Sequence, residues 1–192
     1  MGPDQNNSER LAFTGNLRDL VAAGHRYATI YADPPWPYRN RAARGAAVNH
    51  YPVMSLDQIC AEPVNLLASP DAHLHLWTTN GFLREAFTVI DAWGFNYKSC
   101  FMWIKPQLGA GNYWRVGHEF LLFATRGKQP FRSHSQRSWQ IHPRTEHSSK
   151  PAEIRNLIET VSPGPYLELF GREAFLLSDW TVYGNQISLS LF

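Results

Sequence analysis

The tetrapeptide Asp33-Pro34-Pro35-Trp36 combines residue types that suit one chemical task. An ionised Asp33 only accepts hydrogen bonds, and the two prolines remove backbone N–H donors while fixing φ, so the segment presents rigid acceptors. A rigid acceptor surface beside an indole suits a flat ring that carries an amino group, such as adenine. The other interpretation is a stiff turn that ends a strand and is followed by a core tryptophan.

The amino nitrogen of adenine is a poor nucleophile because its lone pair is delocalised into the ring. Hydrogen bonds from its two hydrogens to the Asp33 carboxylate and the Pro34 carbonyl favour a pyramidal nitrogen that can attack a methyl carbon. Such orientation lowers a barrier by several kcal/mol, up to roughly 7–11 kcal/mol in well-aligned cases. We expect Trp36 to stack on the base, which is worth about 1–3 kcal/mol.

The elements around this tetrapeptide alternate between apolar β-like runs and helical stretches, which predicts an α/β sheet covered on both faces. Strands are expected at 27–32, 73–78, 99–104, 119–125, 166–170 and 181–187. Helices are expected at 16–23, 55–68, 82–93 and 151–161. We expect mixed pairing, with 99–104 and 119–125 forming an antiparallel arm at one edge. Asp33 directly follows the first strand, which is where ligands bind in α/β sheets.

The length and composition predict one soluble domain. The 192 residues can form a single hydrophobic core, expected at 10–192 after a flexible polar N-terminus at 1–9. The sequence has no apolar run near the roughly 20 residues of a membrane span and no signal peptide. Cys60 and Cys100 form no CxxC pair, so we expect buried free thiols in a cytoplasmic protein.

Three segments, 37–52, 106–118 and 126–149, are expected to be loops. The first holds three arginines and no acid, and the third, extended to Lys150, carries six Lys or Arg against one acid. Basic loops with interleaved aromatic residues suit a phosphate backbone and unstacked bases, although a solvated surface is the alternative. We expect the first two loops to close over a target and the third to contact the backbone or flanking bases.

Seven sequence blocks make the chain similar to a known family. They are ADPPW at 32–36, LWTTN at 76–80, WIKP at 103–106, GHE at 117–119, HSSKP at 147–151, ELFGR at 168–172 and WTVYGNQ at 180–186. In this order they resemble the DPPW-bearing N6-adenine methyltransferases, whose eukaryotic members modify messenger RNA and whose bacterial and phage members act on DNA. The resemblance covers residues 16–187.

The resemblance implies a Rossmann-like, class I methyltransferase fold in circularly permuted order, with a mixed, mostly parallel sheet and helices on both faces. It implies S-adenosyl-L-methionine as cofactor, S-adenosyl-L-homocysteine as product, and no metal. Catalysis falls on Asp33, Pro34, Pro35 and Trp36. Cofactor contacts fall on Asn16, Leu17, Asp33, Ser148, Lys150, Phe170, Arg172, Asn185 and Gln186. We expect substrate contacts at Tyr38, Arg39, Trp77, Trp103, Lys105, His118 and Arg132, although Trp77 and Trp103 also fit a plain core role.

Within the cofactor set, the resemblance gives the adenine ring to Asn16 and Leu17, the ammonium to Asp33 and the carboxylate to Ser148 and Lys150. It gives the ribose to Arg172, Asn185 and Gln186. The sequence departs from the family at Ala174-Phe175, where some members carry a His-Asn pair that helps to hold the methionine tail.

The expected function is methylation of the N6 amino group of adenine in nucleic acid. DNA is preferred over RNA because the chain lacks the extra RNA-binding region of eukaryotic members, and a target in a duplex would have to be flipped out. The alternatives are RNA methylation, an inactive nucleic-acid-binding partner subunit, and methylation of a small molecule or protein. An inactive partner subunit is disfavoured because inactive members lose such catalytic or cofactor-binding residues, whereas this sequence has Asp33, Lys150, Arg172 and Asn185. A monomer or homodimer is expected, with a partner subunit still possible.

Overall fold

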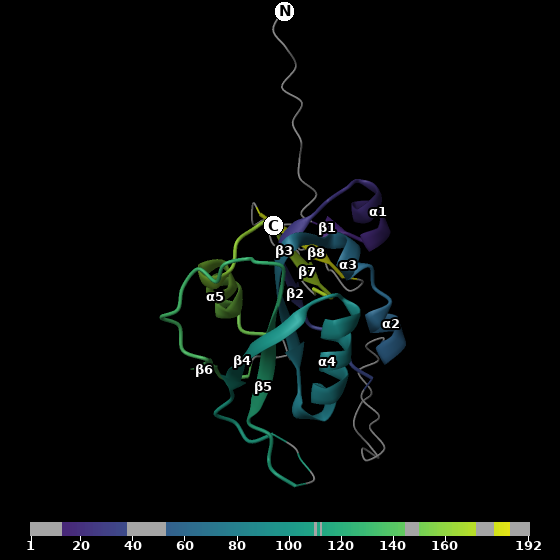
Figure 1. Cartoon of the computed structure of the whole chain (residues 1–192). Coiled ribbons are helices and arrows are strands. Elements are labelled where there is room, and N and C mark those ends of the chain that lie inside the picture. Colours follow the sequence, from purple (N-terminus) through teal and green to yellow (C-terminus); the bar gives the residue numbers. More distant parts are fainter. Residues whose placement is uncertain are drawn as a thin grey trace, which may run out of the picture.

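The computed structural model describes residues 13–37, 53–109, 111, 113–144, 150–171 and 179–184. The described strands form one eight-stranded sheet in the order β1-β8-β7-β2-β3-β5-β4-β6 (Figure 1). The strands are β1 Phe13–Thr14, β2 Tyr27–Ala32, β3 Ala68–Thr78, β4 Asn96–Ile104, β5 His118–Arg126, β6 Trp139–Ile141, β7 Tyr166–Leu169 and β8 Trp180–Tyr183. The helices are α1 Leu17–Ala22, α2 Leu56–Cys60, α3 Val64–Leu67, α4 Leu83–Ala92 and α5 Glu153–Val161, with a short 3-10 helix at Asn80–Phe82.

The pairing is mixed and mostly parallel, as predicted. Strands β1, β8, β7, β2 and β3 run parallel to one another, and β6 runs parallel to β4. Only β5, among the described strands, is antiparallel to both of its neighbours, β3 and β4. The first residues of β5 therefore lie at the edge where β2, β3 and β4 end. We call this the carboxyl edge; it lies at the bottom of Figure 1.

Helices cover both faces of the sheet because the central strands are apolar on both sides. Along β3, alternate residues point to opposite faces, so Leu74 and Leu76 join the core beneath α4 while Trp77 joins the core beneath α5. Helix α4 buries one stripe, Ala86, Val89 and Ile90, against the first face. Helix α5 buries Ile154, Ile158 and Val161 against the second. Figure 1 shows the two helices on opposite sides of the strands.

Four predictions were wrong in detail: one helix, one loop, the place of the antiparallel arm and the burial of the cysteines. The expected helix 55–68 is two helices, because Pro63 lacks the N–H that a continuous helix needs and Ala68 already pairs in β3. The expected loop 126–149 contains β6, which pairs with β4, so the antiparallel arm is not the edge of the sheet. A strand of three residues is too short to show a period-two pattern in the sequence. The two free cysteines are half-buried rather than fully buried.

No helix in the described part of the chain has both the length and the apolar character needed to cross a membrane.

Candidate active site

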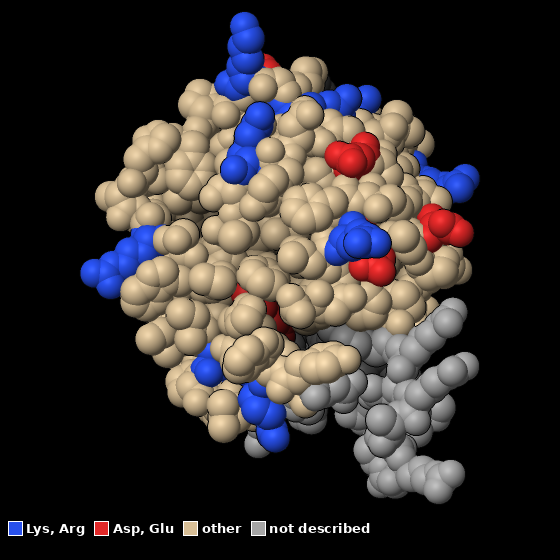
Figure 2. All heavy atoms as spheres, turned by 60° about the horizontal axis from the view of Figure 1, so that its bottom comes forward, with Lys and Arg blue, Asp and Glu red and all other residues tan. Residues whose placement is uncertain are grey.

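Four charged side chains meet at the carboxyl edge, and we call them the carboxyl-edge cluster: Asp33, Lys105, Glu119 and Lys150. Asp33 follows β2, Lys105 follows β4, Glu119 lies at the start of β5, and Lys150 precedes α5. Lys150 Nζ lies 2.6 Å from Asp33 Oδ2 and 3.4 Å from Glu119 Oε2, and Lys105 donates a hydrogen bond to Glu119 Oε1. The four charges therefore alternate in sign. Figure 2 shows carboxylate atoms at the bottom of a hollow in this end of the molecule.

The pairing keeps the centre of the cluster ionised in spite of its burial. Burial alone would lower the pKa of Lys150, but the carboxylates of Asp33 and Glu119 raise it above its usual value. Burial alone would raise the pKa of Glu119, but Lys150 and Lys105 hold it below its usual value. For Lys105, burial lowers the pKa even though Glu119 opposes the shift. Glu119 and Lys150 are thus charged at neutral pH.

Two tryptophans form the floor beneath the lysines. Lys150 Nζ lies 5.3 Å from the ring centroid of Trp77, and Lys105 Nζ lies 4.1 Å from that of Trp103. The two residues are 0% and 2% exposed. Trp77 Nε1 donates to the Tyr31 hydroxyl at 2.8 Å, and Trp103 Nε1 donates to the carbonyl of His142 at 2.8 Å. In this structure both are therefore core residues that support the cluster from below by cation–π contacts.

The backbone corner after Asp33 is held by two hydrogen bonds. The N–H of Trp36 donates to the Pro34 carbonyl at 2.8 Å, and the N–H of Met54 donates to the Pro35 carbonyl at 3.0 Å. A carbonyl oxygen has two lone pairs, so Pro34 can accept one more hydrogen bond. The carboxylate of Asp33 and the Pro34 carbonyl are therefore both available as acceptors in a fixed corner.

Trp36 differs from its expected role as a stacking surface for a base. It is 4% exposed, its ring stacks on Phe82 at a centroid distance of 5.6 Å, and its Nε1 donates to the Trp77 carbonyl at 3.2 Å. An indole gains more from burial against another ring than from exposure at the surface. Trp36 thus anchors the corner to the core and has no open ring face in this structure.

The segments that follow β1, β7 and β8 lie along the same edge. Asn16 caps α1, with its side chain accepting from the Arg18 N–H at 2.9 Å, and the Leu17 side chain is buried in the core. Phe170 has φ 64°, a left-handed conformation that is rare for a residue with a side chain and that occurs preferentially at functional sites. A Cβ atom on Gly184 would collide with the Gly171 carbonyl oxygen, so the two backbones meet closely here.

Two of the expected substrate contacts lie away from the cluster. His118 neighbours Glu119 on β5 and therefore points to the opposite face, where its ring meets Phe120 edge-on at 4.9 Å. The N–H of Arg132 donates to the Val161 carbonyl at 2.9 Å, at the far end of α5 from Lys150. A helix of nine residues is roughly 13 Å long, so Arg132 lies well away from Asp33.

Six of the expected site residues lie outside the described residues: Tyr38, Arg39, Ser148, Arg172, Asn185 and Gln186. Their roles remain predictions. Among the residues that the structure describes, no group of three or more His, Cys, Asp or Glu side chains is arranged to hold a metal ion.

Glu119 is the member of the cluster to which the sequence analysis gave no role. It was noticed only as part of the GHE block. A usable signal was nevertheless present, because Lys105 follows one strand of the antiparallel arm and Glu119 begins the next. Side chains at facing ends of an antiparallel pair lie close enough to interact, and the register pairs Ile104 with His118.

The fold and the site together define a Rossmann-like α/β protein of the kind that binds its ligands at the carboxyl edge of its sheet. The family model described as MT-A70 matches residues 27–186. The chain therefore belongs to the MT-A70 family, the N6-adenine methyltransferases that the seven sequence blocks indicated.

Individual relatives come from bacteria and from animals. The Type II methyltransferase M.MunI of Mycoplasma sp is 29% identical over 185 residues, which cover 84% of this chain and 78% of the relative. The human N(6)-adenosine-methyltransferase catalytic subunit METTL3 is 26% identical over 172 residues, which cover 84% of this chain and 28% of the relative. The N(6)-adenosine-methyltransferase MT-A70-like protein of Drosophila melanogaster is 27% identical over 179 residues, again 28% of its length. The chain thus spans little more than a quarter of these two animal relatives.

Proposed function

We propose that the protein transfers a methyl group from S-adenosylmethionine to the N6 amino group of adenine in DNA. The observation that carries the proposal is the ion pair between Asp33 and Lys150, 2.6 Å apart beside the rigid Pro34-Pro35 corner. It brings an anion, a cation and backbone acceptors to one point of the carboxyl edge. The charged pair suits the amino-acid tail of the cofactor, and the acceptors suit the aromatic amine of adenine.

The corner suits the amine. The adenine amino group has two hydrogens, and the Asp33 carboxylate and the Pro34 carbonyl can accept one each. Accepting both hydrogens orients the nitrogen lone pair and draws it out of conjugation with the ring. Because the corner is fixed by the hydrogen bonds of Trp36 and Met54, little conformational freedom is lost when the amine binds.

The residues of the site also fit the cofactor. Its methionine tail carries an ammonium and a carboxylate, for which Asp33 and Lys150 supply opposite charges. These two residues are paired with each other in this structure, so Lys150 can exchange one carboxylate for another while Glu119 keeps it ionised. When bound, S-adenosylmethionine supplies a methyl group activated by a sulfonium.

The nucleoside end of the cofactor would extend along the carboxyl ends of β7 and β8 toward Asn16. From β2 to β1 the sheet order gives three interstrand steps, roughly 14 Å. The close approach of Gly171 and Gly184 leaves backbone rather than bulky side chains at this part of the edge. Asn16 is exposed at the start of α1, where its polar groups can face an adenine ring.

The choice of DNA is supported by M.MunI, of which the aligned region covers 78% and whose name is that of a Type II methyltransferase. The RNA alternative is supported by the METTL3 name, although only 28% of that relative is aligned. Tyr113 and Trp114, in the connection between β4 and β5 at the carboxyl edge, are 97% and 89% exposed. Exposed rings at such a position suit contacts with unstacked bases.

The test is methyl transfer from labelled S-adenosylmethionine to duplex DNA, single-stranded DNA and RNA by the purified protein. The products are digested to nucleosides and identified by mass spectrometry. We expect N6-methyladenine in DNA. Methyl groups found only in RNA would replace DNA by RNA as the substrate, and transfer to no nucleic acid at all would overturn the proposal.

Asp33→Ala is expected to abolish transfer while leaving the fold intact, because Asp33 both orients the amine and binds the ammonium. The matched control is Asp91→Asn, an exposed carboxylate near the end of α4 and away from the carboxyl edge, which should keep wild-type turnover. Near-normal turnover by Asp33→Ala would refute the catalytic assignment.

A further inference from the structure

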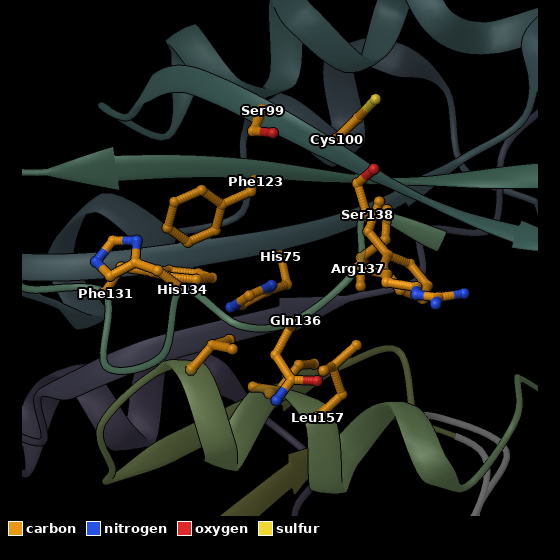
Figure 3. A pocket seen from close by; sticks show the side chains of 14 residues that line it. His75, Ser99, Cys100, Phe123, Phe131, His134, Gln136, Arg137, Ser138 and Leu157 are labelled. Atoms are coloured by element: carbon orange, nitrogen blue, oxygen red, sulfur yellow. The ribbon is translucent and has the colours of Figure 1, made fainter. Parts of the chain in front are cut away.

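A cavity of about 210 Å³ lies between the sheet and helix α5, apart from the carboxyl-edge cluster. Its walls come from β3, β4, β5, the segment 131–138 and α5, and they are mostly apolar. Figure 3 shows His75 reaching from β3 into this space, with Phe123 and Phe131 to one side and Leu157 of α5 facing them. An apolar cavity of about 150 Å³ can hold benzene, so this one has room for a two-ring molecule.

Flat rings already line one side of the cavity. Phe123 and Phe131 meet edge-on at 5.1 Å with an angle of 69°, and Phe123 lies 5.2 Å from the His75 ring. Leu157 and Val161 of α5 close the other side. Walls of this kind favour a planar aromatic molecule over a flexible or strongly polar one.

The one deeply buried polar group in this wall is His75, which belongs to a hydrogen-bonded chain that we call the histidine cluster: His73, Ser162 and His75. Ser162 Oγ lies 2.8 Å from His73 Nδ1 and 2.8 Å from His75 Nε2. His73 Nε2 lies 3.0 Å from the carbonyl oxygen of Gln129. His75 is 5% exposed.

The hydrogen-bond partners determine which ring nitrogen of each histidine in the histidine cluster carries the proton. A carbonyl only accepts, so His73 Nε2 carries a hydrogen and His73 Nδ1 accepts from the Ser162 hydroxyl. That hydroxyl has no second hydrogen, so His75 Nε2 must donate to Ser162 Oγ. Burial holds the pKa of His75 down at about 3, with His73 adding to the effect, so the ring is neutral and its Nδ1 bears a lone pair.

This lone pair has no partner within the part of the chain that the structure describes. Every fully buried side-chain nitrogen or oxygen there has a hydrogen bond, and none is made by His75 Nδ1, so this atom must retain access to the cavity. A buried acceptor that lacks a donor costs free energy, and a ligand that brings one recovers it. The cavity therefore selects for an N–H or O–H group at this point.

We propose that the cavity beneath α5 is a binding site for a flat nitrogen heterocycle of one or two rings whose N–H donates to His75 Nδ1. The rings would lie between Phe123 and Phe131 on one side and Leu157 on the other. Arg137 lines the mouth of the cavity, and its guanidinium carbon lies 5.4 Å from the Trp139 ring centroid. This cation can accept an anionic substituent of the ring at the surface. The site goes beyond the proposed methyl transfer and does not depend on it.

Indole is the probe, and benzofuran, which has the same shape but no N–H, is its control. Binding is measured by calorimetry or ligand-observed NMR in the absence of S-adenosylmethionine and DNA. We expect saturable one-to-one binding of indole, about tenfold tighter than that of benzofuran because benzofuran leaves the acceptor unpaired. No saturable binding of indole, or equal affinity for both probes, would overturn the proposal.

Leu157→Trp fills the cavity from a partly exposed helix position, so the fold should survive, and we expect indole binding to disappear. The matched control is Leu66→Trp in α3, 48% exposed and covering the other face of the sheet, which should bind indole like the wild type. Circular dichroism and the melting temperature report whether each variant folds. Unchanged binding in Leu157→Trp would contradict the location.

The heterocycle can come from a free small molecule or from an unstacked base of a nucleic acid strand. A short single-stranded oligonucleotide separates these sources by competition. Displacement of indole by the oligonucleotide, lost in Leu157→Trp, would identify a base of the strand. Indole binding that the oligonucleotide leaves intact would identify a free molecule. Because no methyl transfer is measured, failure of this site and failure of the proposed function are distinguishable.

Discussion

The two clusters of buried titratable side chains lie at opposite ends of helix α5 and respond to burial in opposite ways. At the start of the helix, Lys150 lies between two carboxylates and its pKa is raised. At the end of the helix, Ser162 joins two imidazoles whose pKa values burial lowers. At neutral pH, Lys150 and Glu119 of the carboxyl-edge cluster stay charged, and the histidine cluster stays neutral.

The difference shows that the partners, more than burial, decide whether a buried group is ionised. Opposite charges within hydrogen-bonding distance offset the cost of desolvation, whereas a hydroxyl and a carbonyl do not. A site of paired charges can exchange one partner for a charged ligand, as the proposed cofactor requires. The neutral histidine cluster ends in the lone pair of His75 Nδ1, so it can bind only a ligand that donates a hydrogen bond, as proposed for the cavity.

Lys150→Met should have the largest effect, because it leaves Asp33 without its cation and leaves Glu119 with Lys105 alone. We expect the free energy of unfolding to fall by about 3 kcal/mol or more near neutral pH, with loss of S-adenosylmethionine binding. Urea unfolding and calorimetry measure the two effects. Lys98→Met, an exposed lysine on β4, is the control, and equal behaviour of both variants would deny the pairing.

The second-largest effect is expected from acid, which should destabilise the folded protein through the histidine cluster. The pKa of His75 is about 3 in the folded protein against 6.5 for the free side chain, so the unfolded chain takes up the proton first as the pH falls. The contribution of neutral His75 to the free energy of unfolding is therefore fully present above about pH 6.5. It falls by about 2–3 kcal/mol between about pH 6.5 and about pH 4.5. Urea unfolding across this range measures the slope. His75→Phe should be less stable at pH 7 but should have a shallower slope, and an unchanged slope would contradict the prediction.

Glu119→Gln should have an intermediate effect of about 1–2 kcal/mol, because the amide still accepts a hydrogen bond from a lysine but no longer balances its charge. The pKa of Glu119 is lowered in the folded protein, so its contribution is present above about pH 4.5 and is lost as the pH falls further. Thermal melts at pH 7 measure the loss. The exposed Glu153→Gln is the control, and the idea fails if both variants melt alike.

Arg132→Ala should have the smallest effect. Arg132 is exposed at the histidine end of α5, where it can contact a phosphate but cannot reach Asp33. We expect DNA to bind a few-fold more weakly and the salt dependence of log K to fall by about one unit of slope, with turnover at saturating DNA unchanged. Fluorescence anisotropy at several salt concentrations measures this. A lower turnover with unchanged affinity would point instead to a role at the carboxyl edge.

Much of the fold was predictable because hydrophobic periodicity is a local property. Strand β2 was predicted with its observed bounds, and the helices that became α1, α4 and α5 were predicted within about two residues. The predicted helix 55–68 was wrong because the apolar pattern was followed through Pro63, although a proline inside such a pattern interrupts a helix. Strand β6 was missed because three residues at a sheet edge carry too little pattern.

The candidate site was predictable where its residues adjoin a motif. Asp33 and Lys150 lie in recognisable blocks, and the structure brings their side chains to 2.6 Å across 117 positions of sequence. Trp36 was expected to stack on a base, with a core position as the alternative, and in the structure it is buried against Phe82. The sequence could not decide between the two, because no local signal distinguishes an indole that stacks on a ligand from one that stacks on another side chain. His118 and Arg132 were chosen by residue type, and the fold directs both away from Asp33.

By itself, the sequence determined the family, the α/β alternation and the acceptor corner that follows the first long strand, because each depends on neighbouring residues. Only the tertiary structure decided that Glu119 and Lys105 complete the charge pattern and that His75 presents a lone acceptor to a cavity. The reason is physical: the charge state of a buried group depends on the distance and geometry of partners that are remote in sequence. The folded sheet and helix α5 supply those partners.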